Sequence, residues 1–281
     1  MNIKRIALIL CAATLALTLS SCGILPRREK ADHMEFTYDR QTDSYTLVYY
    51  TDTSLVTELT IPDTFKDKKV TGIGRLAVSS AENLVKITLG RFIGEIDRWG
   101  IVDCRYLKAI EVPAENEAFV SIGGVLYTRD MTKLVTYPNA RAAEYSGSGA
   151  LLKTASYTVE PGTKIIGHAA FYKCYGLGGI VLPESIEVIE DRAFHKCDAL
   201  GDIAFPEGLR VVGKDAFLGC EGFEHVTLPS TVTEIGDYAF YNAMNVKTVH
   251  VNAAKGDVVL GQKWYPTSAG RPLSALEITW G

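Results

Sequence analysis

The 281-residue sequence predicts a repeat solenoid of the β-rich α/β class, in which short parallel strands and short helical turns stack into a superhelix. One observation behind this prediction is an Ala-Phe dipeptide that recurs every 23 residues. A second is that the apolar residues around each dipeptide occupy the same columns in successive repeats. A third is the composition, because 47% of the residues are hydrophobic, which is enough to build a core.

Four repeats define the template most clearly. Their phenylalanine column consists of Phe171, Phe194, Phe217 and Phe240. Three positions later, a column of small residues consists of Cys174, Cys197, Cys220 and Ala243. The template continues upstream in a weaker form, so that about six rungs of 23 residues cover residues 59–113 and 159–251.

Each rung is expected to contain two strands and one helical turn. The I-x-L-P segment alternates with period two and ends at proline, which predicts a short strand with inward-facing Ile and Leu. The segment before Ala-Phe predicts a second strand or a turn. The A-F-x-x-C-x-x-L segment has an apolar spacing of three, which predicts one helical turn. A single rung cannot cover its own apolar faces, so only stacked rungs form a stable core.

The amino-terminal segment predicts export rather than a part of the fold. Lys4 and Arg5 precede an almost uninterrupted apolar run over residues 6–19, which is too short for a spanning helix and typical of a signal peptide. The sequence Leu-Ser-Ser-Cys-Gly that ends at Gly23 resembles a bacterial lipobox, in which Cys22 is lipidated. Residues 1–21 would then be a lipoprotein signal peptide. The alternatives are an ordinary secretory peptide and a buried amino-terminal helix.

The lipobox resemblance implies a location in the bacterial cell envelope. Residues 22–34 are charged and lack apolar periodicity, which indicates a lipidated tether. Under the sorting rule of Gram-negative lipoproteins, glycine instead of aspartate at Gly23 disfavours retention on the inner membrane. We therefore expect a lipid-anchored protein on the outer membrane or the cell surface.

The repeat pattern P-x-x-(I/V)-x-x-I-G-x-x-A-F-x-x-C-x-x-L-x-x-I-x-(L/I)-P resembles the BspA-like (Treponema pallidum-type) leucine-rich repeats of bacterial surface proteins. The resemblance implies a leucine-rich-repeat superhelix with repeats 1–2 in residues 59–113 and repeats 3–6 in residues 159–251. It also implies a β-hairpin cap over residues 35–58 and a β-hairpin insertion over residues 114–158. Residues 252–281 lack the template and are expected to form a carboxyl-terminal cap.

The cysteines and histidines indicate structural roles. Cys104, Cys174, Cys197 and Cys220 share one inward-facing column, which predicts free core thiols rather than disulfides or a zinc site. The histidines have no metal-ligand spacing and are expected on the surface; they are His33, His168, His195, His225 and His250.

No catalytic motif or cofactor-binding motif occurs in the sequence, so we expect a non-enzymatic protein that needs no cofactor and no metal. Trp99 takes the column that holds Tyr238 in the last rung. That position favours a half-buried spacer over a sugar-stacking platform.

The residues that flank the inward-facing Ile and Leu of the strands are expected to line one continuous sheet surface. The candidate binding residues on it are Lys86, Thr88, Glu111, Asp202, His225, Thr227, Thr248 and His250. Repeat solenoids bind macromolecules on such long, rigid surfaces. The alternative is that these residues only keep the sheet soluble.

The resemblance implies protein–protein interaction or adhesion to host matrix or to other cells, with a protein ligand and a membrane contact through the lipid. A structural or assembly scaffold within the envelope is the first alternative, and a carbohydrate-binding module is the second. The formal net charge of -4 argues against nucleic acid as a partner, because phosphate binding requires a basic face.

Overall fold

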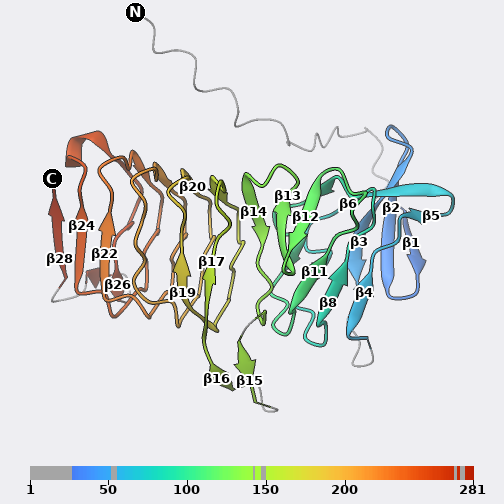
Figure 1. Cartoon of the computed structure of the whole chain (residues 1–281), viewed down its shortest axis with the longest axis horizontal. Helices are drawn as coiled ribbons and strands as arrows, with labels where there is room; N and C mark the ends of the chain where they lie inside the picture. Colours follow the sequence, from blue (N-terminus) through green and yellow to red (C-terminus); the bar gives the residue numbers. More distant parts are fainter. Residues whose placement is uncertain (1–26, 52–55, 142, 147–149, 269–270, 273–275) are drawn as a thin grey trace, which may run out of the picture.

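The chain winds into an elongated solenoid of about nine turns, with the amino-terminal strands at one end and the carboxyl-terminal strands at the other (Figure 1). Most turns contribute strands to one or both of two faces, and a series of tight turns forms a third face. The predicted solenoid class is therefore confirmed. The computed structural model describes residues 27–51, 56–141, 143–146, 150–268, 271–272 and 276–281.

The I-x-L-P segments form the first face, here called the strand face. Its strands pair in parallel and in register, so that Ile87 lies opposite Leu59 and Ile110 of the neighbouring turns. All three side chains are buried. Among the described residues this face is divided into three sheets, which are β4 (Glu58–Thr60), β8 (Lys86–Thr88) and β11 (Ala109–Glu111); β17 (Ala155–Thr158) and β19 (Leu177–Val181); and β22 (His225–Leu228), β24 (Thr248–Val251) and β28 (Glu277–Trp280).

The segments before Ala-Phe form the second face, an eight-stranded sheet made mostly of two-residue strands. Ile166 and Ile189 pair in register and are buried, whereas Ile165 and Val188 beside them are partly exposed. The sheet consists, in spatial order, of β12 (Phe119–Ile122), β13 (Val125–Thr128), β14 (Lys133–Thr136), β18 (Ile165–Ile166), β20 (Val188–Ile189), β21 (Val211–Val212), β23 (Glu234–Ile235) and β25 (Val259–Leu260).

The A-F-x-x-C segments form the third face, here called the turn face, and the helical turn predicted for them is wrong. Arg192 and Lys196 have left-handed φ values of 58° and 57°, which interrupt any helix. Every second N–H instead donates to the next turn, so that Phe194 N–H bonds the Ala216 carbonyl at 2.8 Å. Since these N–H groups stabilise stacking, they are not available for a helix. Among the described residues the helical content is one 3-10 helix, η1 (Lys255–Asp257).

The core contains the predicted phenylalanine column. Phe194 and Phe217 are fully buried, with ring centroids 5.1 Å apart and planes 4° apart, and Phe240 continues the stack at 5.1 Å. The cysteine column is buried beside it, as predicted. Cys197 Sγ–H donates to the Phe171 carbonyl at 3.0 Å, so each thiol also links neighbouring turns.

The amino-terminal strands close the first end of the solenoid. β3 pairs antiparallel with β2 but parallel with β6, so it already acts as part of the first turn. The strands of this end are β1 (Arg28–Ala31), β2 (Met34–Asp39), β3 (Ser44–Tyr50), β5 (Thr64–Phe65), β6 (Lys68–Ile73) and β9 (Glu95–Ile96), followed by the pair β7 (Val78–Ser79) and β10 (Ile101–Val102).

Residues 114–158 interrupt the template but still supply a turn. β12, β13 and β14 form an antiparallel meander, and β14 then pairs in parallel with β18. β13 lies between two apolar cores, because Leu126 packs into the amino-terminal core whereas Val125 and Tyr127 pack into the carboxyl-terminal one. β15 (Glu144–Tyr145) and β16 (Leu151–Lys153) form a second hairpin that projects from the body (Figure 1).

The residues after the last recognisable repeat continue both ladders. β25 pairs in parallel with β23, and β28 pairs in parallel with β24. Trp264 is buried, and its carbonyl accepts the Phe240 N–H at 2.9 Å. β26 (Thr267–Ser268) and β27 (Arg271–Pro272) form a short hairpin between them. About nine turns therefore exist where the sequence template predicts about six, because the additional turns keep the pairing geometry without the repeat consensus.

Candidate functional site

The strand face brings the amino-terminal candidate residues together. Lys86 and Thr88 lie on β8, and Glu111 lies opposite Thr88 on β11. Lys86 Nζ forms an ion pair with Glu58 Oε2 at 2.6 Å on the neighbouring strand. Glu111 is exposed. This group therefore offers partner molecules a surface of mixed charge rather than a single sign.

A second group occupies the strand face at the carboxyl-terminal end. His225 and Thr248 face each other across β22 and β24, and His225 Nδ1 lies 2.8 Å from Thr248 Oγ1. Thr227 lies opposite His250, whose Nδ1 is 2.6 Å from Thr279 Oγ1 on β28. The lateral hydrogen bonds hold both imidazole rings in place on the outer surface.

Asp202 differs from the other candidates. It lies outside the strands, and its Oδ1 accepts the backbone N–H groups of Glu224 at 2.8 Å and His225 at 2.9 Å. This geometry gives the carboxylate a structural task, since it fixes the start of β22 on the preceding turn.

The two groups do not share one sheet, so the prediction of a continuous sheet surface is wrong. The two-stranded sheet of β17 and β19 and the turn around Ile203, which forms no strand, lie between them. The meander of residues 119–136 also enters the stack, where the Gly124 carbonyl accepts the Ile110 N–H at 2.8 Å and takes the place of a ladder partner for β11. Cys22, the proposed lipidation site, lies outside the described residues.

The turn face carries a group of aromatic residues whose contacts the sequence pattern did not predict. We call it the seam cluster and define it by its members Trp99, His168, Tyr172, Arg192 and His195. The Trp99 ring meets His168 edge-on with centroids 4.7 Å apart, and Tyr172 edge-on at 5.6 Å. The Arg192 guanidinium lies 5.5 Å from the Trp99 ring centroid. Tyr172 and His195 stack at 5.0 Å.

Trp99 is half-buried, in agreement with the spacer interpretation. The insertion separates Trp99 from the other members in sequence, so periodicity alone gave no sign of their contact. The sequence contained one indication of this contact: Trp99 is a large aromatic residue in the last rung before the insertion.

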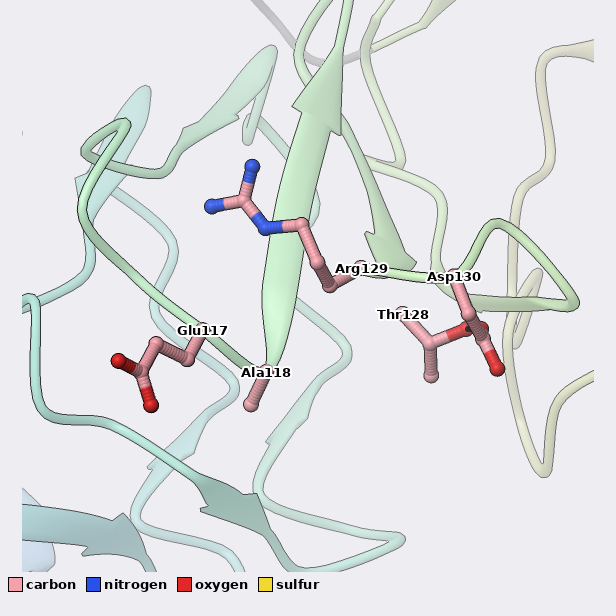
Figure 2. A pocket seen from close by; sticks show the side chains of 5 residues that line it. All are labelled: Glu117, Ala118, Thr128, Arg129 and Asp130. Carbon is pink, nitrogen blue, oxygen red and sulfur yellow. Dashed lines mark hydrogen bonds between the residues drawn. The ribbon is translucent and has the colours of Figure 1, made fainter.

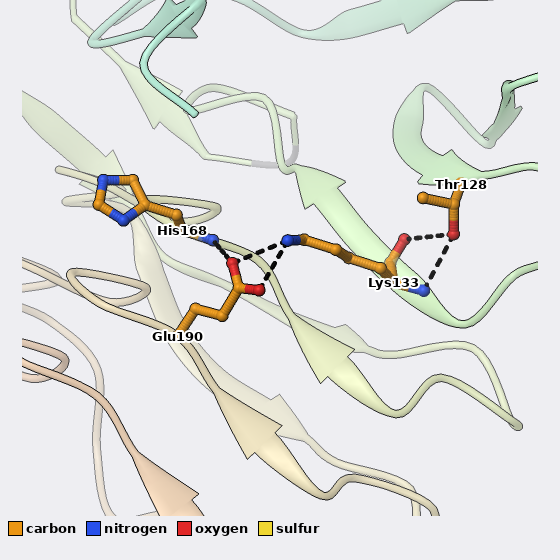
Figure 3. A network of polar contacts seen from close by, with 4 residues as sticks. All are labelled: Thr128, Lys133, His168 and Glu190. Atoms are coloured by element: carbon orange, nitrogen blue, oxygen red, sulfur yellow. Dashed lines mark hydrogen bonds and ion pairs between the residues drawn. The ribbon is translucent and has the colours of Figure 1, made fainter. Parts of the chain in front are cut away.

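A polar network anchors the insertion beside the seam cluster (Figure 3). Lys133 Nζ contacts both carboxylate oxygens of Glu190 at 2.7 and 2.8 Å, and the backbone N–H of His168 donates to Glu190 Oε2 at 2.7 Å. Gly167 lies between them, where an added Cβ would approach the Leu134 carbonyl oxygen at 2.6 Å. The absence of a side chain at Gly167 thus lets Lys133 reach across one turn to its partner.

Burial and neighbouring cations keep the two seam histidines neutral. Burial lowers the pKa of His168 to about 4, and Arg98 and Arg192 act in the same direction. Asp191 and Glu190 oppose this shift without cancelling it. Burial likewise lowers the pKa of His195 to about 4. His168 Nε2 and His195 Nδ1 are buried without a hydrogen-bond partner among the described residues.

The depressed pKa values predict acid sensitivity. Because each folded-state pKa lies below the ordinary value of 6.5, the unfolded chain binds protons that the folded chain does not between pH 6.5 and 4. The free energy of unfolding should therefore fall as the pH falls through this window. Since both rings are partly exposed, we expect about 1–2 kcal/mol per histidine after solvent screening.

Urea unfolding at pH 7 and pH 4 measures this effect. The His168→Gln/His195→Gln variant should lose less stability on acidification than the unmodified chain, whereas the exposed-site control His225→Gln should lose the same amount as the unmodified chain. Equal losses in the double variant and the unmodified chain would contradict the prediction.

Neither of two depressions on the described surface contains a catalytic arrangement among the described side chains. The larger, about 370 Å³, is lined by Glu117, Ala118, Thr128, Arg129 and Asp130 (Figure 2). Asp130 Oδ1 accepts a hydrogen bond from the Thr128 hydroxyl at 2.7 Å, and the Glu117 side chain points away from Asp130 (Figure 2).

The second depression, here called the seam cleft, adjoins the seam cluster. Its volume is about 200 Å³, and four successive turns contribute to it. Lys173 Nζ pairs with Asp103 Oδ2 at 2.6 Å, and Asn139 Nδ2 donates to the carbonyls of Tyr172 and Lys173. The cleft is lined by Ser80, Glu82, Asp103, Arg105, Asn139, Lys173 and Tyr175.

The described part of the chain contains no group of three or more His, Cys, Asp or Glu side chains placed to hold a metal ion. None of its helices has the length and apolar character needed to cross a membrane.

Comparison with known proteins identifies the repeats. Residues 150–257 match the BspA type leucine rich repeat region in six copies. No curated protein matches the sequence. The chain is similar to a leucine rich cell surface protein from Faecalibacterium prausnitzii A2-165, with a TM-score of 0.53 and 16% identity over 92% of this chain and 96% of that one.

Two other solved structures are less similar. The pneumococcal vaccine antigen PcpA gives a TM-score of 0.48 with 16% identity over 88% of this chain and 89% of that one. The leucine rich repeat protein TpLRR of T. pallidum gives 0.33 with 19% identity over 90% and 86%. The repeat match and the likeness to the F. prausnitzii structure agree with the pairing described above: the chain folds as a leucine-rich-repeat solenoid, and its residues 150–257 match BspA type repeats.

Proposed function

We propose that this protein is a non-enzymatic interaction module of the bacterial cell surface, which binds a protein partner through its strand face and serves adhesion to host matrix or to other cells. The observation that carries the proposal is the register of the outward rows. His225, Thr248 and Glu277 form one row, and Thr227, His250 and Thr279 form the next. A rigid backbone thus presents side chains of varied chemistry at fixed spacing, as protein recognition requires.

The location is part of the same proposal. A diacylglycerol on Cys22 would tether the solenoid through the residues that precede Arg28. The expected tether of residues 22–34 is too long, because Arg28–Ala31 forms β1 and Met34 begins β2. The amino-terminal end of the solenoid would then lie nearest the membrane. The F. prausnitzii relative is described as a cell surface protein, which supports an exposed location. Trypsin treatment of intact cells tests this part, because a surface protein is cleaved whereas a scaffold inside the envelope survives.

Partner binding is tested with recombinant residues 27–281 as bait in extracts of host extracellular matrix. The Lys86→Glu/Glu111→Lys variant reverses two charges on the strand face without changing the net charge. We expect it to bind the captured partner about tenfold more weakly, because misplaced interfacial charges oppose complementarity. Biolayer interferometry gives the dissociation constants.

Asp202 is left intact in this experiment, because its hydrogen bonds to the next turn would confuse a binding loss with a folding defect. The matched control is Lys255→Glu, on the exposed helix η1 away from the strand face. Unchanged affinity in the strand-face variant, or equal loss in the control, would show that the strand face is not the site.

A further inference from the structure

We propose that the seam cluster and the seam cleft together form a second docking site, which binds an acidic segment of a protein partner. This site lies on the turn face, apart from the strand face, and makes use of residues from both sides of the insertion. It goes beyond the proposed function, since it can be occupied whether or not the strand face binds a partner.

The composition of the seam cluster is that of a protein-binding hot spot. Tryptophan, tyrosine and arginine supply most of the binding energy at protein interfaces, because they combine large contact areas with a polar end. Here Tyr172 and Arg192 both contact Trp99, because the Tyr172 ring centroid lies 5.6 Å and the Arg192 guanidinium 5.5 Å from the Trp99 ring centroid. All three are partly exposed. Their mutual packing holds them in one arrangement before any partner arrives, which lowers the entropic cost of binding.

The orientation of the rings disfavours a sugar as the occupant. Tyr172 and His195 stack against each other with planes 17° apart, so each covers a face of the other. Trp99 receives Arg192 near its ring and meets His168 edge-on at 81°. Pyranose rings stack on open aromatic faces, whereas protein segments also contact ring edges and hydroxyl groups.

The charge around the cluster selects an acidic segment. Lys173, Arg192 and Lys196 all act on His195 as positive charges, and no acid offsets them there. Arg192 and Lys173 are partly neutralised by Asp215 and Asp103. Lys196 and Arg98 are exposed, and neither forms an ion pair with another described residue. These two cations are therefore available to carboxylates of a partner.

The seam cleft provides a small binding depression next to the aromatic rings of the seam cluster. Lys173 belongs to its lining and also lies 5.3 Å from the Tyr172 ring centroid, which joins the two features. The volume of about 200 Å³ suits a side chain rather than a whole ligand. A carboxylate placed there would compete with Asp103 for the cation of Lys173.

Fluorescence anisotropy with a labelled octaglutamate peptide tests the site at low salt. The folded chain should bind octaglutamate and not octalysine. The Arg98→Glu/Lys196→Glu variant, which changes two exposed side chains that form no hydrogen bond or ion pair with described residues, should bind at least about tenfold more weakly. Trp99→Phe should also weaken binding while leaving the thermal unfolding midpoint nearly unchanged.

Controls separate this site from general attraction and from the strand face. Lys255→Glu/Lys108→Glu reverses two exposed lysines elsewhere and should keep most of the affinity, as should the strand-face variant Lys86→Glu/Glu111→Lys. Equal loss in Lys255→Glu/Lys108→Glu and Arg98→Glu/Lys196→Glu would reduce the binding to net charge and overturn the proposal. Absence of octaglutamate binding, or binding of the uncharged oligosaccharide chitohexaose that Trp99→Phe abolishes, would overturn it as well.

Discussion

Replacing Phe217 with alanine should lower the free energy of unfolding by about 3–5 kcal/mol. The Phe217 ring is fully buried and stacks between Phe194 and Phe240, with centroids 5.1 Å away on each side. Phe205 and Phe223 also contact it edge-on. Alanine therefore removes contacts in three directions and leaves a cavity that the rigid ladders on either side cannot close. Guanidinium unfolding followed by circular dichroism measures the change.

The matched control is Phe92→Ala. Phe92 is only partly buried, and the cations Lys69 and Arg91 lie 4.4 and 4.7 Å from its ring centroid. We expect a loss of about 1 kcal/mol there, because an exposed cation–π contact contributes little. A Phe217→Ala loss no larger than that of Phe92→Ala would show that the phenylalanine column does not hold the turns together.

The second large effect is expected at Gly236, where the turn passes very close to its neighbour. A Cβ added there would lie 2.5 Å from the backbone nitrogen of Lys214 and 2.7 Å from the carbonyl carbon of Gly213. Backbone atoms cannot swing away as a flexible side chain does, so the two turns must separate. We expect Gly236→Ala to lower the free energy of unfolding by about 2–3 kcal/mol, as overpacked core sites do.

Gly256→Ala is the matched comparison, since an added Cβ at Gly256 meets nothing within 4 Å. This variant should change the free energy of unfolding by less than about 0.5 kcal/mol, as surface substitutions usually do. Both are measured under the same denaturant conditions. Equal effects in the two variants would mean that the ladders tolerate a wider spacing at Gly236 than the close approach implies.

The repeating part of the fold could be predicted in detail. A constant spacing of 23 residues requires equal turns, and equal turns place Phe171, Phe194, Phe217 and Phe240 in one column. Alternation in the I-x-L-P segments gave the strand face and the inward position of Ile87 and Ile110. These features follow from local periodicity, which the sequence displays directly.

The conformation of the turn face could not be predicted in the same way. Arg192, Lys196 and Tyr238 adopt left-handed φ values although none of them is glycine. An apolar spacing of three fits both a helical turn and two successive tight turns. What decides between them is that alternate N–H groups bond carbonyls of the next turn, whereas the N–H groups between them bond carbonyls three residues back in the same segment. That preference exists only when a neighbouring turn is present.

Some features of the candidate sites could likewise be predicted from local periodicity, and others could not. The outward positions of Lys86, Thr88 and Thr227 follow from strand alternation, whereas the structural task of Asp202 depends on which N–H groups the next turn presents to it. The turns formed by β14, β25 and β28 were missed, because their residues satisfy the pairing geometry while departing from the consensus.

The sequence by itself determined that the chain stacks equal turns around a column of phenylalanine rings and thiols. The reason is that stacked turns of equal length bury apolar residues that recur at a constant spacing. Only the tertiary structure decided where the sheets break and that Trp99 meets His168 and Tyr172 across the insertion. The physical reason is that contacts between residues far apart in the chain depend on how the intervening segment folds. The path of the insertion is set by its packing against the amino-terminal and the carboxyl-terminal core at the same time. No local sequence pattern encodes that packing.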